Sequence, residues 1–228
     1  MNNKLRGKLT RFWRSDRGLS AFLALLVLSV LVLYPLNVSR GYGQIANDIS
    51  ASLLLLGGIA AASERPRLLA LVASTIAVTL VLRWADWVVP SASLAAWQDL
   101  FLCLSLGMLA LVILGQVFRE GPVNHHRIQG AIAAYLLIGM TWAAAYELVA
   151  LLIPGSFTGT FGSGLVGEQS WLYFSYATLT TVGYGDIVAV HPIARSMAVT
   201  EAMAGQFYVA ILVARLVSQQ IEDRKKRD

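Results

Sequence analysis

Long runs of apolar residues, separated by short polar segments, make up most of this sequence. A helix that crosses a bilayer needs about 20 apolar residues, and six runs of about that length occur here. They are Leu19–Val38, Ile45–Ala62, Leu68–Val89, Leu94–Phe118, Ile128–Ile153 and Pro192–Val217. The second run is the weakest, because Asn47, Asp48 and several small residues dilute it. The pattern predicts an all-α integral membrane protein with six transmembrane helices.

A segment of different character separates the last two runs. Residues 154–167 are rich in Gly, Ser and Thr, which predicts an exposed loop. Residues 168–180 (EQSWLYFSYATLT) are aromatic and apolar, but they are too short to span a membrane and favour a re-entrant helix. Irregular backbone at membrane depth is tolerated only where protein buries it or where it lines a water-filled path. Functional residues are therefore expected directly after this short helix.

Composition and charge agree with a membrane protein and suggest its orientation. Hydrophobic residues make up 57% of the chain and charged residues 14%, whereas a soluble domain carries about 25% charged residues. If the N-terminus lies in the cytoplasm, most of the 18 basic residues fall on the cytoplasmic side of the membrane, and only Arg40, Arg83 and Arg195 fall on the outer side. This asymmetry predicts a multi-pass protein of the cell membrane with both termini in the cytoplasm. The basic ends flank apolar runs, so they favour anionic lipid over nucleic acid as a partner.

The segment after the short helix reads TTVGYGD, from Thr180 to Asp186. It resembles the selectivity filter of the potassium channel family, in which carbonyl oxygens replace the hydration shell of K⁺. The resemblance covers residues 128–217 and implies a passive, K⁺-selective channel without a cofactor, in which K⁺ is the transported ion. It further implies that K⁺ is held by carbonyls of four residues and by one threonine hydroxyl. These residues are Thr181, Val182, Gly183 and Tyr184, and the hydroxyl is that of Thr181.

The residue types of this segment suit that role. Gly183 and Gly185 can adopt positive φ, so successive carbonyls can point toward one axis. One chain supplies one of the four strands needed around an ion, which predicts a homotetramer around a central pore.

The scattered His and Glu residues and Cys103 form no acid–base or metal-binding cluster, so an enzyme is not expected. A non-conducting or regulatory channel subunit is the alternative, although the intact filter disfavours it.

Residues near the filter are candidates for its support. Many family members carry a pair of tryptophans where this chain has Tyr173 and Phe174. Ala177 stands where some members place a carboxylate that pairs with the position of Asp186. We therefore expect Asp186 to cap backbone donors or to meet a neighbouring chain. Glu147 either bonds the backbone around Asp186 or is exposed at the membrane interface.

The last apolar run resembles the inner helix of prokaryotic two-span pore domains. Gly205 occupies the position that matches the hinge glycine of those domains. Glu201 lies one turn earlier on the same face, where it would either brace the re-entrant helix or add negative potential near the cavity. Four residues that follow at helical spacing are candidates to line the cavity and an inner apolar constriction. The alternative is that each of them is an ordinary packing position. They are Gln206, Val209, Val213 and Val217.

These assignments divide the chain into five parts. A basic cytoplasmic segment (1–18) precedes a four-helix domain (19–118), a cytoplasmic linker (119–127), a pore domain (128–217) and a short basic tail (218–228). The pore domain comprises an outer helix (128–153), a re-entrant helix (168–180), the filter (180–186) and an inner helix (192–217). No Lys or Arg occurs from Trp84 to Phe118, so a conventional voltage sensor is not predicted. The gating stimulus stays open, including whether His125 and His126 sense internal pH.

Overall fold

The computed structural model describes residues 16–30, 43–61, 66–88, 91–118, 125–159 and 168–225. Its helices are α2 (Asp16–Leu28), α4 (Gly43–Ala61), α5 (Pro66–Ala85), α6 (Ala92–Val117), α7 (His125–Leu152), α8 (Glu168–Leu179) and α9 (Pro192–Lys225). Two short strands, β1 (Phe157–Gly159) and β2 (Ile187–Ala189), flank the predicted filter. The predicted all-α membrane protein is confirmed.

Helices α5, α6, α7 and α9 contain stretches long and apolar enough to cross a membrane. In α4 the apolar stretch is shorter and covers Asp48–Ile59. Helix α2 begins just before the predicted span Leu19–Val38 and covers its first part, and the last residues of that span, 31–38, lie outside the described residues. The count of six spans therefore stays a prediction.

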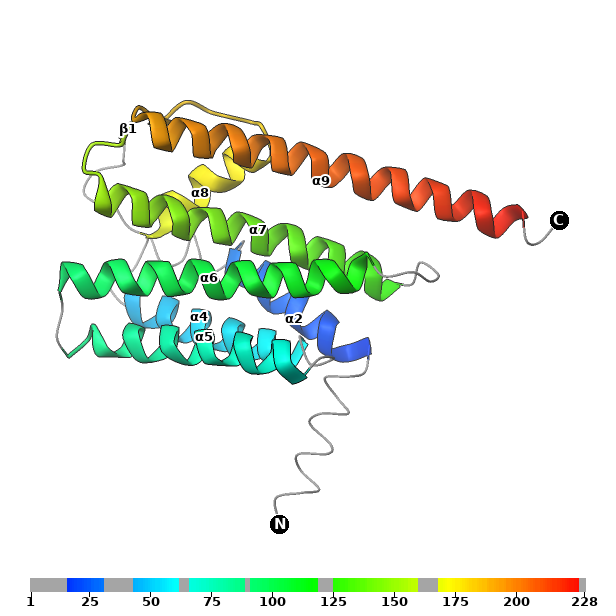
Figure 1. Cartoon of the computed structure of the whole chain (residues 1–228), viewed down its shortest axis with the longest axis horizontal. Coiled ribbons are helices and arrows are strands. Elements are labelled where there is room, and N and C mark those ends of the chain that lie inside the picture. Colours follow the sequence, from blue (N-terminus) through cyan, green and yellow to red (C-terminus); the bar gives the residue numbers. More distant parts are fainter. Residues whose placement is uncertain are drawn as a thin grey trace, which may run out of the picture.

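The long helices lie side by side, with consecutive helices running in opposite directions (Figure 1). Helix α7 lies between α6 and α9, and the short α8 occupies the space between α7 and the first half of α9 (Figure 1). Helices α2 and α4 lie behind the layer formed by α5 and α6. The four N-terminal helices thus form one bundle that borders the pore region along α7.

One continuous apolar core joins this bundle to α7. Its buried side chains come from five helices: Phe22 and Leu26 of α2, Leu54 and Leu55 of α4, Val72 and Ile76 of α5, Leu106, Leu109 and Ile113 of α6, and Ala133, Ala134 and Leu137 of α7. The alanines of α7 let α6 approach closely, because small side chains at a helix interface allow close packing of backbones. The four-helix bundle is therefore packed directly on α7, the predicted outer pore helix of its own chain.

A buried ion pair connects α4 and α5 inside the bundle. Arg83 Nε lies 2.5 Å from Asp48 Oδ1, and Trp87 Nε1 donates to Asp48 Oδ2 at 2.8 Å. Arg83 is 3% exposed and Asp48 is 4% exposed. Charges at membrane depth are costly unless they are paired, so this pair satisfies both residues. It also explains how a basic residue is accommodated near the end of a predicted span.

Exposed tryptophans gather at the end of the bundle where α5 meets α6. Trp84 lies at the end of α5, Trp87 in the turn that follows it and Trp97 near the start of α6, each about half exposed. Tryptophan is enriched where the apolar core of a bilayer meets the headgroups. These side chains mark one interface of the membrane-spanning bundle.

Strands β1 and β2 form a two-stranded antiparallel ribbon, with Phe157 opposite Ala189 and Gly159 opposite Ile187. The sequence analysis placed residues 157–159 in an exposed loop, which is wrong for Phe157, because its side chain is buried. A three-residue strand carries no periodic signal, and its partner follows the filter in sequence. Residues 160–167 of the predicted loop lie outside the described residues.

Candidate functional site

Helix α8 is anchored to α7 by close packing and by two side-chain hydroxyls. Tyr176 donates to the carbonyl of Leu136 at 2.8 Å, and Ser175 Oγ lies 2.7 Å from the carbonyl oxygen of Gly139. A Cβ atom at Gly139 would collide with the Tyr176 ring. Glycine at this position therefore lets the short helix lie against α7, which fixes where the following segment begins.

Glu201 joins all three helices of the pore region. Its carboxylate is completely buried and accepts hydrogen bonds from the hydroxyls of Tyr146 on α7 and Ser175 on α8, each at 2.5 Å. A buried carboxylate requires such donors, because its loss of hydration is otherwise uncompensated. The structure turns Glu201 toward the re-entrant helix, as the bracing alternative requires. Tyr146 and Ser175 were missed from the sequence, where they are ordinary polar residues within apolar helices.

The two aromatic candidates on α8 face different surroundings. Phe174 packs into a buried cluster behind the filter, with ring centroids 4.9 Å from Tyr146 and 5.5 Å from Phe157. Tyr173 instead stacks on the filter residue Tyr184, with centroids 5.9 Å apart and planes at 11°. Only Tyr173 of the pair therefore touches the filter, whereas Phe174 holds α8 against α7 and β1.

The backbone from Thr181 to Gly185 alternates in conformation. Thr181, Gly183 and Gly185 have φ angles of 60°, 54° and 80°, whereas positive φ does not occur at Val182 or Tyr184. Alternation of left- and right-handed residues turns successive carbonyls toward the same side of the strand, as a carbonyl-lined ion path requires. Thr181 is β-branched, so its left-handed conformation is strained and has to be held by neighbouring contacts.

The carbonyl end of α8 holds the first part of this segment. The amide of Thr181 donates to the carbonyl of Thr178 at 2.9 Å, and the amide of Gly183 donates to that of Ala177 at 3.1 Å. These bonds satisfy carbonyls that a helix end leaves without partners. The negative end of the helix dipole lies at the start of the segment, where it favours a cation.

The outer residues of the segment are exposed in the single chain, and Tyr184 is 70% exposed. Asp186 Oδ1 accepts from the amide of Ile187 at 3.0 Å, which is one of the two roles expected for this carboxylate. Glu147 is partly buried on α7, and its two alternative roles, a bond to the backbone near Asp186 or exposure at the membrane interface, stay predictions. An apolar recess of about 310 Å³ opens beside the filter, between Tyr173, Ala177 and Val182.

Helix α9 passes directly beneath the end of α8. A Cβ atom at Gly205 would collide with the backbone carbonyl oxygen of Leu179, the last residue of α8. Gln206 Nε2 donates to Thr181 Oγ1 at 3.1 Å. The expected hinge position is thus also the point of closest approach between the inner helix and the filter base. Helix α9 is continuous through Gly205.

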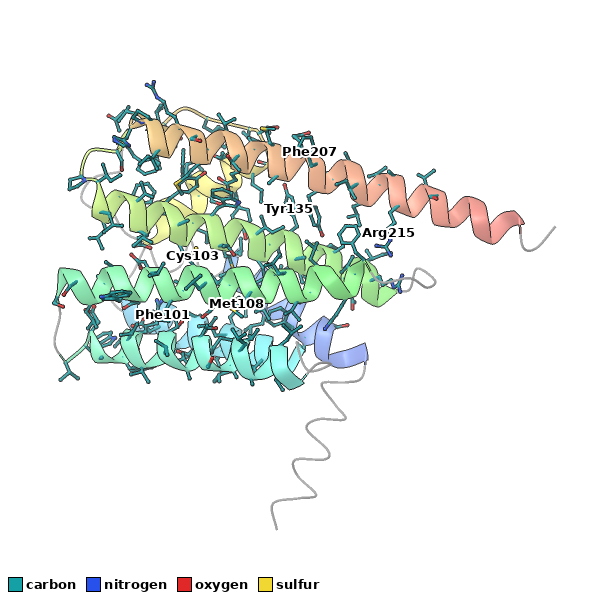
Figure 2. The ribbon with its side chains drawn as sticks, in the orientation of Figure 1. Phe101, Cys103, Met108, Tyr135, Phe207 and Arg215 are labelled. Carbon is teal, nitrogen blue, oxygen red and sulfur yellow. The ribbon has the colours of Figure 1, made fainter. Side chains whose placement is uncertain are left out.

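Contacts with α7 hold the inner helix below this point. Tyr208 donates to the carbonyl of Ala131 at 2.5 Å, and its ring lies 5.3 Å from that of Tyr135, which occupies the space between α7 and α9 (Figure 2). Further along, the guanidinium of Arg215 lies 5.0 Å from the ring centroid of Phe118 at the end of α6. The sequence analysis did not single out these residues, because their contacts join helices distant in sequence.

The remaining candidates on α9 lie on its exposed surface. Val209, Val213 and Val217 are each about half exposed in the single chain. They share this exposure with Met203 and Phe207, so an apolar face runs along much of the helix. His125 and His126 fall in the first turn of α7 rather than in a linker.

Comparisons with known proteins define the class to which this site belongs. Residues 134–221 match a family model described as "Ion channel". A rice protein named two pore potassium channel c is 34% identical over 91 residues, which cover 40% of this chain and 18% of that protein. Two-pore potassium channel 1 of Arabidopsis thaliana is 31% identical over 109 residues, covering 48% of this chain and 27% of the relative.

A bacterial relative matches over a stretch of similar length. The inward rectifier potassium channel Kirbac3.1 of Paramagnetospirillum magnetotacticum is 27% identical over 89 residues, covering 37% of this chain and 26% of that protein. This chain thus spans about a quarter or less of the length of these curated relatives. No solved structure gives a significant match.

The fold and the comparisons agree on an ion channel domain in a membrane protein. Residues 134–221 match the ion channel family model and the relatives are named potassium channels, so the resemblance carried by the TTVGYGD segment is confirmed. This family is a class of ion channels and not of enzymes. The matched family model begins at residue 134 and does not include the four-helix bundle before α7.

Proposed function

We propose that four copies of this chain form a passive, K⁺-selective channel in the cell membrane. The observation that carries the proposal is the alternating backbone at Thr181, Gly183 and Gly185, held at the end of α8. In such a channel, carbonyls of Thr181, Val182, Gly183 and Tyr184 and the Thr181 hydroxyl would surround K⁺ in place of water. The selectivity filter would comprise residues 180–186.

The exposed surfaces of the single chain support assembly. Val182 and Tyr184 are 54% and 70% exposed, and the apolar face of α9 is open along Phe207, Val209 and Val213. A conduction path is filled with water, and large apolar surfaces are rarely left exposed to water. The apolar surface beside this path is therefore expected to be covered by protein. Further copies would cover the recess beside the filter, and the half-exposed valines of α9 would line the cavity or meet a neighbour.

The distribution of charge supports an orientation and a mode of gating. Both termini are proposed to be cytoplasmic, with the basic ends at anionic lipid. The four-helix domain, residues 19–118, would lack voltage sensing, because α6 contains no Lys or Arg and Arg83 is paired with Asp48. Each charge that crosses the field contributes about 2.3 kcal/mol per 100 mV, so conductance should depend only weakly on voltage.

The test is the reversal potential of purified protein in planar bilayers under opposed K⁺ and Na⁺ gradients. A value near the K⁺ equilibrium potential is expected, and a value between those of the two ions would refute K⁺ selectivity. Gly183→Asp should abolish the current, because it places a side chain on a left-handed residue of the filter. Light scattering should give a protein mass of four times 24.7 kDa. A silent tetramer would favour the regulatory-subunit alternative.

A further inference from the structure

The side chain of Gln206 reaches the inner end of the filter. Its Nε2 lies 3.1 Å from Thr181 Oγ1, although the two residues belong to different elements of the pore region. The contact exists because Gly205 lies directly beneath the Leu179 carbonyl, where any larger residue would push α9 away. The glycine thus places the next side chain of α9 at the base of the filter.

The two threonine hydroxyls at this end have different partners. Thr180 donates its hydroxyl to the carbonyl of Tyr176 at 2.6 Å and is therefore engaged within the end of α8. Thr181 Oγ1 instead accepts a hydrogen bond from Gln206. A hydroxyl oxygen has two lone pairs, so the amide of Gln206 occupies one of those that a cation would use.

We propose that Gln206 weakens cation binding at the innermost filter site by competing with the ion for Thr181 Oγ1. This inference rests on the proposed function, because it assumes that Thr181 faces the ion path. The N–H group presents the positive end of its dipole to the hydroxyl that a cation would approach. Gln206 therefore acts on the ion through Thr181, and it is not itself a ligand in this contact.

The nearby carboxyl group of Glu201 on α9 does not offset this effect. Glu201 lies five residues before Gln206, and it is completely buried and bonded to Tyr146 and Ser175. Its carboxyl group is directed between α7 and α8 and not toward Thr181. The polar group on α9 that meets the filter is therefore the neutral amide of Gln206.

Block by internal Ba²⁺ tests the proposal, because Ba²⁺ is a divalent cation close to K⁺ in size. Gln206→Met keeps the length of the side chain but removes both N–H donors. A neutral hydrogen bond has a net free energy of about 0.5–1.5 kcal/mol, which corresponds to a change of roughly 2- to 10-fold in affinity. The variant should therefore bind internal Ba²⁺ more tightly than the wild type by roughly 2- to 10-fold.

Gln129→Met is the matched control. Gln129 on α7 accepts a hydrogen bond from Ser20 at 2.8 Å, so this substitution removes another membrane glutamine without touching the filter. The Ba²⁺ affinity of this control should equal that of the wild type. Gln206→Ala provides a second variant in case Gln206→Met does not assemble, and it should change the affinity in the same direction.

The outcomes separate this inference from the proposed function. Tighter Ba²⁺ binding in the Gln206 variants alone supports the inference, whereas unchanged or weaker binding overturns it. A wild-type protein that conducts without K⁺ selectivity overturns the proposed function instead. Calorimetric titration of Ba²⁺ into the purified tetramers repeats the comparison without an open pore. An absence of Ba²⁺ binding by the wild type there would overturn the inference as well.

Discussion

Replacement of Gly205 by alanine separates two roles for this residue. As a hinge, Gly205 would supply backbone freedom, and alanine would stiffen α9 without disturbing its packing. In the structure, however, an added Cβ meets the backbone carbonyl of Leu179. A backbone carbonyl at a helix end cannot rotate away as a flexible side chain can. We therefore expect Gly205→Ala to displace α9 from the base of the filter.

The expected magnitude combines two opposing effects. Alanine stabilises a helix interior by about 0.8–1.0 kcal/mol relative to glycine. Overpacking a well-packed contact costs about 1–3 kcal/mol. The net result is a loss of about 1 kcal/mol of stability per chain, which lowers the melting temperature by about 2–4 °C in a protein of this size.

Gly115→Ala provides the matched control for this experiment. Gly115 also lies within an apolar membrane helix, α6, but a Cβ added there would meet no atom within 4 Å. This control should gain stability from helix propensity alone. Thermal unfolding of the purified protein, followed by size-exclusion chromatography, measures both variants. If Gly205→Ala melts at or above the wild-type temperature, as Gly115→Ala should, the packing argument is refuted.

Two buried polar clusters give further predictions. Glu201→Ala removes an acceptor shared by two hydroxyl donors, so it should cost roughly 3 kcal/mol of stability in thermal unfolding, whereas Tyr146→Phe should cost about half as much. Equal melting temperatures for Glu201→Ala and the wild type would contradict the bracing role. Arg83→Gln should cost about 3–5 kcal/mol, because it leaves the carboxylate of Asp48 buried without its charged partner. Adding Asp48→Asn should recover part of this loss, and a double variant less stable than Arg83→Gln would argue against the pairing.

Local sequence patterns contain much of the information about the architecture of the pore region. The apolar runs that became α5, α6, α7 and α9 are recognisable because membrane-spanning length is set by the thickness of the bilayer. The short helix α8 follows from the same argument, since its apolar segment is too short to span. The segment TTVGYGD is recognisable because its glycines and threonines provide backbone geometry and oxygen ligands in consecutive residues.

Contacts between separate elements could not be predicted in this way. The sequence is compatible with two roles for Glu201. The choice between these roles depends on contacts with Ser175 and Tyr146, which come from two other helices. The strand at Phe157 likewise depends on pairing with Ala189 across the filter. Neither feature has a periodic pattern along the chain, because its partners are brought together only by folding.

The sequence by itself determined a multi-span membrane protein with a segment that resembles a potassium channel filter, because hydrophobic length and the TTVGYGD signature are local properties. Tertiary structure decided how that filter is held. It placed Glu201 inside the protein, Gly205 against the carbonyl of Leu179, and Gln206 on the hydroxyl of Thr181. It also packed the four-helix bundle on the α7 of the same chain. These features depend on which helix faces lie against each other, and that arrangement is fixed by side-chain packing between elements distant in sequence.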